Sequence, residues 1–165
     1  MIMLNCYSTT KSDNSSGTQD PLNGTWRLVQ HDEGGIYAHT ELILNNGSWE
    51  STMKYEYPAM DMFYDGPYMR GTFSTNNNQY TSVTTAVYGG YYLMFEANPY
   101  DFTTKWYSKE EFFDVYREYC NAMGLPEESL NALLSTLEPI FEQNTTTYSI
   151  SGNTLVLGGY TYNKV

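Results

Sequence analysis

The stretch Leu22-Asn23-Gly24-Thr25-Trp26-Arg27-Leu28-Val29-Gln30 marks the point at which this chain changes character. Residues 7–20 before it are rich in Ser, Thr, Asn and Asp and nearly free of apolar side chains, which is typical of a flexible tether. The stretch itself has the pattern of an apolar strand and begins with Gly-x-Trp. We therefore expect residues 1–20 to form a leader and residues 21–165 to form one folded domain.

The composition favours a single domain that does not bind nucleic acid. The 165 residues are 41% hydrophobic and 16% aromatic, enough for one core and too few for two full domains. The formal net charge is −11, from 8 basic against 19 acidic residues. A polyanion would meet repulsion at such a surface, so nucleic acid is not an expected partner.

Short strands separated by turn signals make up most of the domain. Asn45-Asn46-Gly47 is typical of a hairpin turn, and Ser48–Tyr57 alternates apolar and polar residues with a period of two. About eight antiparallel strands predict a mainly β, up-and-down β-barrel, which closes on itself and removes exposed edges. The expected strands are Leu22–Gln30, Thr40–Leu44, Ser48–Tyr57, Tyr68–Thr75, Gln79–Tyr88, Tyr91–Glu96, Thr145–Ile150 and Thr154–Tyr162, with a loop over Pro58–Pro67.

A helical hairpin is expected over residues 108–143, before the last two strands. Ser108-Lys109-Glu110-Glu111 is a capping box, in which the Ser hydroxyl and a Glu carboxylate bind the free amides at a helix start. Apolar residues then recur at steps of three and four, Gly124 ends the first helix and Pro126 permits a second. The apolar side of this hairpin must cap an open barrel end or pack beside a strand.

Four pieces of the sequence resemble lipocalin-like bacterial proteins of the calycin superfamily. They are Gly24-Thr25-Trp26, Asn46-Gly47-Ser48-Trp49, Met69-Arg70-Gly71-Thr72-Phe73-Ser74 and Thr147–Leu155, and the resemblance loosely covers Leu22 to Lys164. It implies that a basic side chain near the last strand packs over the Trp of the first strand and closes one barrel end. Lys164, in place of the usual Arg, is the residue expected to lie over Trp26.

The N-terminus resembles the tail of a bacterial lipoprotein signal. Met1-Ile2-Met3-Leu4-Asn5-Cys6 is a short apolar stub that ends at a cysteine, which in such proteins becomes the lipidated first residue. This implies an extracytoplasmic protein, lipid-anchored to a bacterial membrane or periplasmic, that contacts the membrane only through Cys6. A plain disordered terminus and a Cys6–Cys120 disulfide are the alternatives. Neither cysteine has the spacing of a zinc or dithiol motif.

The inward residues of such a barrel either fill it or line a cavity for one small ligand. Aromatic and Met side chains suit apolar recognition, and Tyr hydroxyls can orient a polar head group. The candidate ligand-binding residues are Trp49, Met53, Tyr55, Tyr57, Phe73, Val83, Tyr92 and Met94.

Catalytic, cofactor and metal chemistry have weak support in the sequence. It contains no Gly-x-Ser-x-Gly, phosphate-binding loop or dinucleotide fingerprint, so no enzyme activity and no cofactor are expected. No spacing brings two of the carboxylates Asp61, Asp65, Glu96 and Asp101 together. The remaining metal-like grouping is His31, Asp32, His39 and Glu41, for which a solvated hairpin end is the favoured interpretation and no metal is expected.

Two functions follow from these observations. The first is a non-enzymatic envelope binding protein, a monomer by default, that holds a small hydrophobic or amphipathic ligand in the barrel. The alternative is an interaction module with a filled barrel that presents Tyr-rich loops, such as Pro58–Tyr68 and Gly89–Tyr92, to a protein or a carbohydrate.

Overall fold

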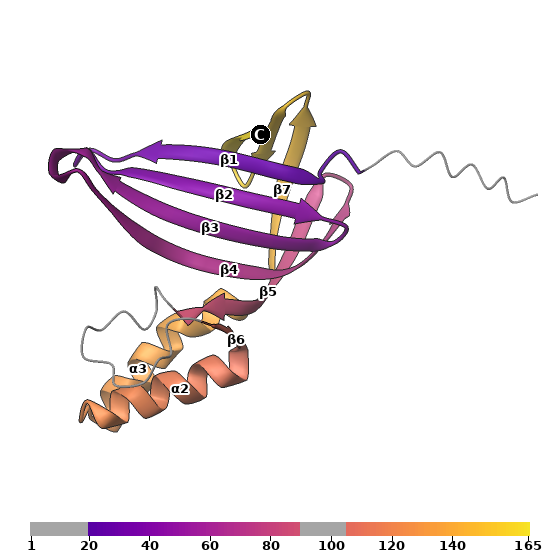
Figure 1. Cartoon of the computed structure of the whole chain (residues 1–165). Coiled ribbons are helices and arrows are strands. Elements are labelled where there is room, and N and C mark those ends of the chain that lie inside the picture. Colours follow the sequence, from indigo (N-terminus) through magenta and orange to yellow (C-terminus); the bar gives the residue numbers. More distant parts are fainter. Residues whose placement is uncertain (1–19, 90–104) are drawn as a thin grey trace, which may run out of the picture.

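The computed structural model describes residues 20–89 and 105–165 (Figure 1). The expected strand Tyr91–Glu96, with the candidates Tyr92 and Met94, lies outside these residues, as do residues 1–19 of the leader, with Cys6. The strands are β1 (Gly24–His31), β2 (Tyr37–Asn45), β3 (Ser48–Tyr57), β4 (Met62–Asn76), β5 (Gln79–Tyr88), β6 (Trp106–Ser108), β7 (Asn144–Ser151), β8 (Thr154–Leu157) and β9 (Tyr160–Lys164). The helices are α2 (Lys109–Ala122) and α3 (Glu127–Leu137), with 3-10 turns η1 (Pro58–Met60) and η3 (Glu138–Phe141).

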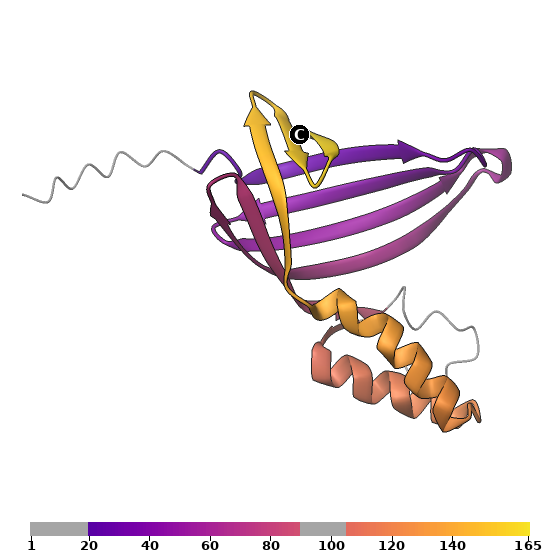
Figure 2. The same ribbon diagram turned by 180° about the vertical axis from the view of Figure 1, so that it is seen from behind.

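The described strands other than β6 form a closed antiparallel barrel, as Figures 1 and 2 show. Their order is β4-β3-β2-β1-β9-β8-β7-β5, and pairing of β4 with β5 closes the ring. β6 pairs with the last three residues of β5, beyond the part of β5 that pairs with β7. The predicted up-and-down barrel with a helical insertion is therefore confirmed.

The expected loop Pro58–Pro67 is mostly strand. Only η1 and Asp61 turn the chain, after which β4 pairs with β3 from Met62 onward. The register of this pair shifts between Thr52 and Lys54, opposite Gly66 and Pro67. A proline donates no ladder hydrogen bond, so Gly66-Pro67 fits a bulge inside a strand rather than the end of a loop.

The expected last strand, Thr154–Tyr162, is divided into β8 and β9. Gly158 and Gly159 have φ of 59° and 86° and turn the chain between them. Glycine adopts this left-handed conformation without steric cost, which permits a tight hairpin here. The helical insertion consequently precedes three strands rather than two.

The strands of the barrel differ in length, so β1 to β4 extend beyond the closed ring. β9 pairs with β1 only at Trp26 and Arg27, and β5 pairs with β4 only from Met69 onward. The far halves of β1 to β4 therefore continue as a four-stranded curved sheet. In Figure 2 no described helix or strand lies in front of the inner face of this extension.

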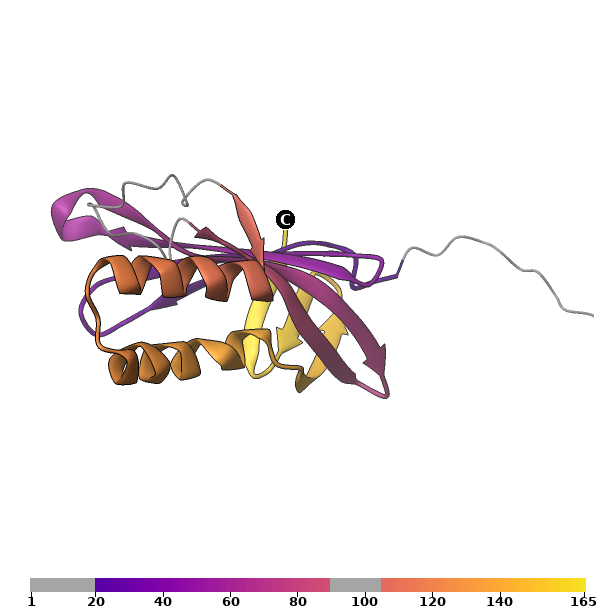
Figure 3. The same ribbon diagram turned by 90° about the horizontal axis from the view of Figure 1, so that it is seen from below.

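Two hydrophobic clusters stabilise the described residues. The barrel cluster is built on Trp26, Leu155 and their neighbours at the end of the barrel where β1 begins. The helix cluster joins α2, α3 and η3 to Val87 of β5 and Tyr107 of β6, both fully buried. The helical hairpin therefore packs beside the β5–β6 strands, as Figure 3 shows from below.

Candidate binding pocket

One end of the barrel is closed by the contact expected from the sequence. Trp26 is fully buried, and its Nε1 donates a hydrogen bond to the carbonyl oxygen of Leu22 at 2.8 Å. Lys164 pairs with Trp26 across β1 and β9, and its Nζ lies 5.0 Å from the centroid of the indole ring. A cation over an indole face is attracted by the ring electrons, so this contact joins the first and last strands.

Residues beside the Trp also hold this end together. Gly24 has φ of 144°, and a Cβ on it would lie 2.7 Å from Cε of Lys164. The buried Asn23 exchanges two hydrogen bonds of 2.9 Å with Asn46 in the β2–β3 turn. The role of Asn23 was not predicted, because its partner is 23 residues away.

The part of the barrel next to this end is filled. Leu22, Leu44 and Leu155 are at most 1% exposed, and all belong to the barrel cluster. The rings of Phe73 and Tyr80 stack with their centroids 5.1 Å apart. Phe73, expected to line a cavity, therefore belongs to a packed floor.

A pocket of about 310 Å³ lies beside this floor and opens to solvent at the exposed residues Asn144, Thr145 and Tyr160. It receives side chains from β2 to β5 and from β7 to β9, so both halves of the chain build it. The lining residues are Leu42, Trp49, Ser51, Met69, Tyr80, Ser82, Asn144, Thr145, Thr146, Leu157, Tyr160 and Tyr162.

Hydroxyl and amide groups supply the polar part of this lining. Burial raises the pKa of Tyr80 far above its ordinary value, and the neighbouring Tyr162 raises it further. Burial also raises the pKa of Tyr162, with a smaller contribution from Tyr160. These phenols consequently stay protonated near neutral pH and can donate hydrogen bonds.

The residues predicted to bind ligand are distributed over several environments. Trp49 lines the pocket, and its Nε1 donates to the carbonyl oxygen of Thr72 at 3.1 Å. By alternation, Met53, Tyr55 and Tyr57 lie on the same face of β3 as Trp49. They belong to the four-stranded extension of β1 to β4, however, and do not line this pocket. The ring of Tyr57 packs edge-on against Tyr64, with centroids 5.2 Å apart.

The assignment of Val83 to the interior is wrong. Val83 pairs with Thr72, whereas Tyr80 and Ser82 line the pocket. Successive side chains of a strand point to opposite faces, so Val83 belongs to the outer face of β5. Without the β4–β5 register, the sequence pattern alone did not distinguish the two faces.

Tyr160 and Tyr162 line the pocket, but the sequence pattern does not indicate them as interior residues. They lie on β9, which was expected to be the end of one long strand running from Thr154. The signal that would have identified them is Gly158-Gly159, because paired glycines indicate a turn.

The side chains considered as catalytic carboxylates or metal ligands contact different residues instead of converging on one site. Glu41 accepts a hydrogen bond from Arg27 at 2.8 Å, and Nε2 of His39 lies 2.7 Å from Oε2 of Glu56. Within residues 20–89 and 105–165, no group of three or more His, Cys, Asp or Glu side chains is arranged to hold a metal ion. Asp65 accepts a hydrogen bond from the hydroxyl of Tyr68 at 2.8 Å, and Glu96 and Asp101 lie outside the described residues.

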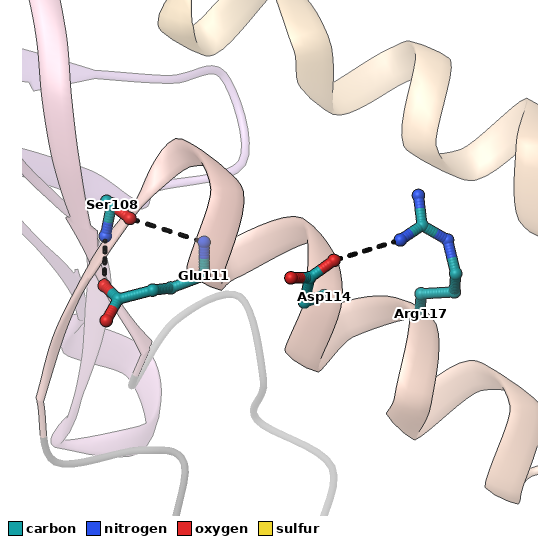
Figure 4. A network of polar contacts seen from close by, with 4 residues as sticks. All are labelled: Ser108, Glu111, Asp114 and Arg117. Carbon is teal, nitrogen blue, oxygen red and sulfur yellow. Dashed lines mark hydrogen bonds and ion pairs between the residues drawn. The ribbon is translucent and has the colours of Figure 1, made fainter.

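A second hollow, of about 650 Å³, lies between α2 and α3. Its walls include Lys109, Glu110 and Arg117, and Arg117 donates to Asp114 at 3.2 Å, as Figure 4 shows. Long charged side chains on exposed helix faces are solvated and mobile, so this groove is a weaker candidate for specific recognition. We take the barrel pocket as the candidate site.

Comparison of the chain with protein-family models, with curated proteins and with solved structures found no match. The structure alone therefore defines the class of this protein. Its fold is a closed eight-stranded antiparallel barrel, which is compatible with a lipocalin-like fold. Such a barrel is consistent with a binding protein. Neither α2 nor α3, nor any other helix within the described ranges, has the length and apolar character needed to cross a membrane.

Proposed function

We propose that this chain is a non-enzymatic, lipocalin-like binding protein that holds one small hydrophobic or amphipathic ligand in its barrel. The observation that carries the proposal is the pocket of about 310 Å³ beside the packed floor. Its volume is at the lower end of the range of about 300–1,000 Å³ for small-molecule sites. A compact small molecule therefore fits this space.

The lining suits an amphipathic ligand. Leu42, Met69 and Leu157 supply aliphatic and thioether surface, and the ring of Trp49 adds an aromatic face. Hydroxyl groups on β5 and β9 supply hydrogen bonds. A few polar groups among apolar ones orient a ligand, while burial of apolar surface provides the affinity.

A bacterial cell envelope is the proposed location, with Cys6 as a lipid anchor. The support is the stub Met1–Cys6, the polar residues 7–20 and the resemblance of the chain to bacterial lipoproteins. A polar composition of this kind suits a tether between a lipid anchor and a domain.

A second candidate, an interaction module, is favoured by the tip of the β3–β4 hairpin. Met60 and Phe63 are 57% and 64% exposed there, and Tyr64 is 40% exposed. Exposed aromatic side chains provide contact area at low entropic cost. If this function is correct, Tyr64→Ala weakens capture of a partner by the protein and leaves occupancy of the barrel pocket unchanged.

Filling the pocket should abolish ligand retention. Ser82 lines the pocket and is half-buried, whereas Ser74 is an exposed residue of β4 that lies outside it. We expect wild type purified from its natural host to carry a small molecule in native mass spectrometry, and Ser82→Phe to lose it. Ser74→Phe adds the same side chain on the surface and should retain the ligand.

Thermal unfolding of the three proteins separates lost binding from lost folding. A folded Ser82→Phe variant that still carries the molecule would contradict the pocket as its site. Wild type with no copurifying molecule and no affinity for small apolar probes would contradict the proposed function.

A further inference from the structure

The barrel pocket has no charged lining. Among the described residues that form it, none is Asp, Glu, Lys, Arg or His. Its polar atoms are the hydroxyls of Ser, Thr and Tyr and the amide of Asn144. A ligand in the pocket therefore meets neutral donors and acceptors only.

Three basic side chains on the barrel strands make contacts outside the pocket. The Lys164 ammonium lies over Trp26, with the carbonyl oxygen of Pro21 at 3.5 Å. The guanidinium of Arg70 lies 4.6 Å from the ring centroid of Trp106, and Arg27 is paired with Glu41. None of these three basic residues lines the pocket, so an anionic ligand would lack a counter-ion there.

The tyrosines reinforce this neutrality. A phenol with its ordinary pKa of about 10 is already uncharged near neutral pH, and burial raises the pKa of both Tyr80 and Tyr162 further. Each keeps a hydrogen that it can donate to a carbonyl, ether or hydroxyl oxygen. Ser51 and Ser82, which also line the pocket, can donate or accept.

We propose that the pocket selects uncharged ligands with an apolar body and a neutral hydrogen-bonding group, and that it rejects carboxylates and sulfonates. This inference rests on the proposed function. An anion that loses water in the pocket gains no ion pair in exchange, and unpaired charge is costly to desolvate. The chain's net charge of −11 adds long-range repulsion of anions.

Two fluorescent dyes test the selectivity because they share one aromatic frame. N-phenyl-1-naphthylamine is neutral, and 1-anilinonaphthalene-8-sulfonate is the same molecule with a sulfonate. Titration of the full chain with each dye should give a dissociation constant at least about tenfold lower for the neutral one. Ser82→Phe should remove binding of the neutral dye, which places that dye in the pocket.

A charge introduced into the pocket should reduce the preference for the neutral dye. Asn144 is exposed, lines the pocket and pairs with Ser82, so Asn144→Lys adds an ammonium without disturbing the buried core. This variant should bind the sulfonate dye at least about tenfold more tightly than wild type does. Thr147→Lys is the matched control, since Thr147 belongs to the same strand and lies outside the pocket.

The outcomes distinguish the two proposals. Equal affinity of wild type for both dyes supports a binding pocket but overturns the selectivity. Binding of neither dye overturns the proposed function and, with it, the inference. An equal gain in sulfonate binding for Thr147→Lys and Asn144→Lys would show that overall charge, rather than the pocket lining, excludes anions, and would overturn the inference.

Discussion

At the scale of single residues, Gly24, Trp26 and Lys164 form one structural unit. Gly24 leaves the space that the Lys164 side chain occupies, and Lys164 covers the ring of Trp26. The Gly-x-Trp motif is thereby explained by a contact between the two ends of the domain. It is a structural contact, because none of these three residues lines the pocket.

Gly24→Ala tests this unit. A Cβ at this position would meet Lys164, and the positive φ is a conformation that L-residues rarely adopt. We expect the free energy of unfolding in urea to fall by about 1–3 kcal/mol. Gly35→Ala is the control, since Gly35 has φ of 81° but a Cβ added to it would have no neighbouring atom within 4 Å.

The difference between the two losses contains the contact with Lys164 together with the unequal backbone φ of the two glycines, 144° and 81°. It should shrink when Lys164→Ala is combined with Gly24→Ala, because the neighbour that obstructs the new methyl group is gone. An equal loss from Gly24→Ala in wild type and in the Lys164→Ala background would mean that the close approach of Lys164 has no energetic effect.

At the scale of elements, the start of α2 is determined locally. The Ser108 hydroxyl accepts a hydrogen bond from the amide of Glu111, and the Ser108 amide donates to the Glu111 carboxylate at 3.0 Å (Figure 4). The bond from the Ser108 amide lowers the pKa of Glu111, and that from the Ser108 side chain lowers it further. The sequence predicted this capping box because all its partners lie within four residues.

Glu111→Gln should change how the stability depends on pH. The carboxyl pKa is lower in the folded state than its ordinary value of 4.5, so its stabilisation is complete above that pH. It is lost as the pH falls through the folded-state pKa. We therefore expect wild type to be more stable than Glu111→Gln near neutral pH, with the difference shrinking in acid.

Urea unfolding followed by circular dichroism at several pH values measures this difference. Glu110→Gln is the control, because Glu110 lies in the same first turn but does not bind Ser108. A stability difference between wild type and Glu111→Gln that stays constant from neutral pH into acid would contradict the role of the carboxylate.

Element boundaries were predicted less well where pairing decides them. β3 was predicted with its observed bounds because its own alternation is regular. β4 begins at Met62, well before the expected Tyr68, because β3 offers a long partner that overrides the turn signals of Gly66-Pro67. β6 was not predicted, since Trp106–Ser108 is a strand only through pairing with β5.

At the scale of the whole molecule, the two hydrophobic clusters have different roles. The barrel cluster fills one end and leaves the pocket beside it, whereas the helix cluster fastens the helical hairpin to β5 and β6. Met69 packs against the helix cluster and also lines the pocket. No residue of α2 or α3 lines the pocket, so the hairpin supports its rim through Met69 without forming a wall.

The proposed location is tested on the whole protein in its natural host. If Cys6 carries a lipid, Cys6→Ser should move the protein from the membrane fraction to the soluble fraction. Cys120→Ala should not, because the Cys120 thiol is buried in the helix cluster and forms no disulfide with any residue that the structure describes. Wild type and Cys6→Ser that fractionate alike would contradict the anchor.

The features that could be predicted from the order of amino acids depend on near neighbours, on a strict period or, in one case, on a resemblance. These are the antiparallel strands, the Asn46-Gly47 turn, the capped start of α2 and the pairing of a first-strand Trp with a terminal basic residue. Alternation, turn chemistry and capping act within a few residues, and the Trp–Lys contact was inferred from a resemblance. The mainly β barrel was predictable because alternation and turn residues identify its strands and hairpins.

The filled and hollow parts of the barrel, in contrast, are set by tertiary pairing. The pocket is built by strands from both halves of the chain, and its lining depends on their registers and unequal lengths. A shift of one residue moves a side chain from the interior to the surface, which is why Val83 was misassigned. The neutral lining likewise emerges only when Tyr162, Ser51 and Ser82 are brought together by closure of the sheet.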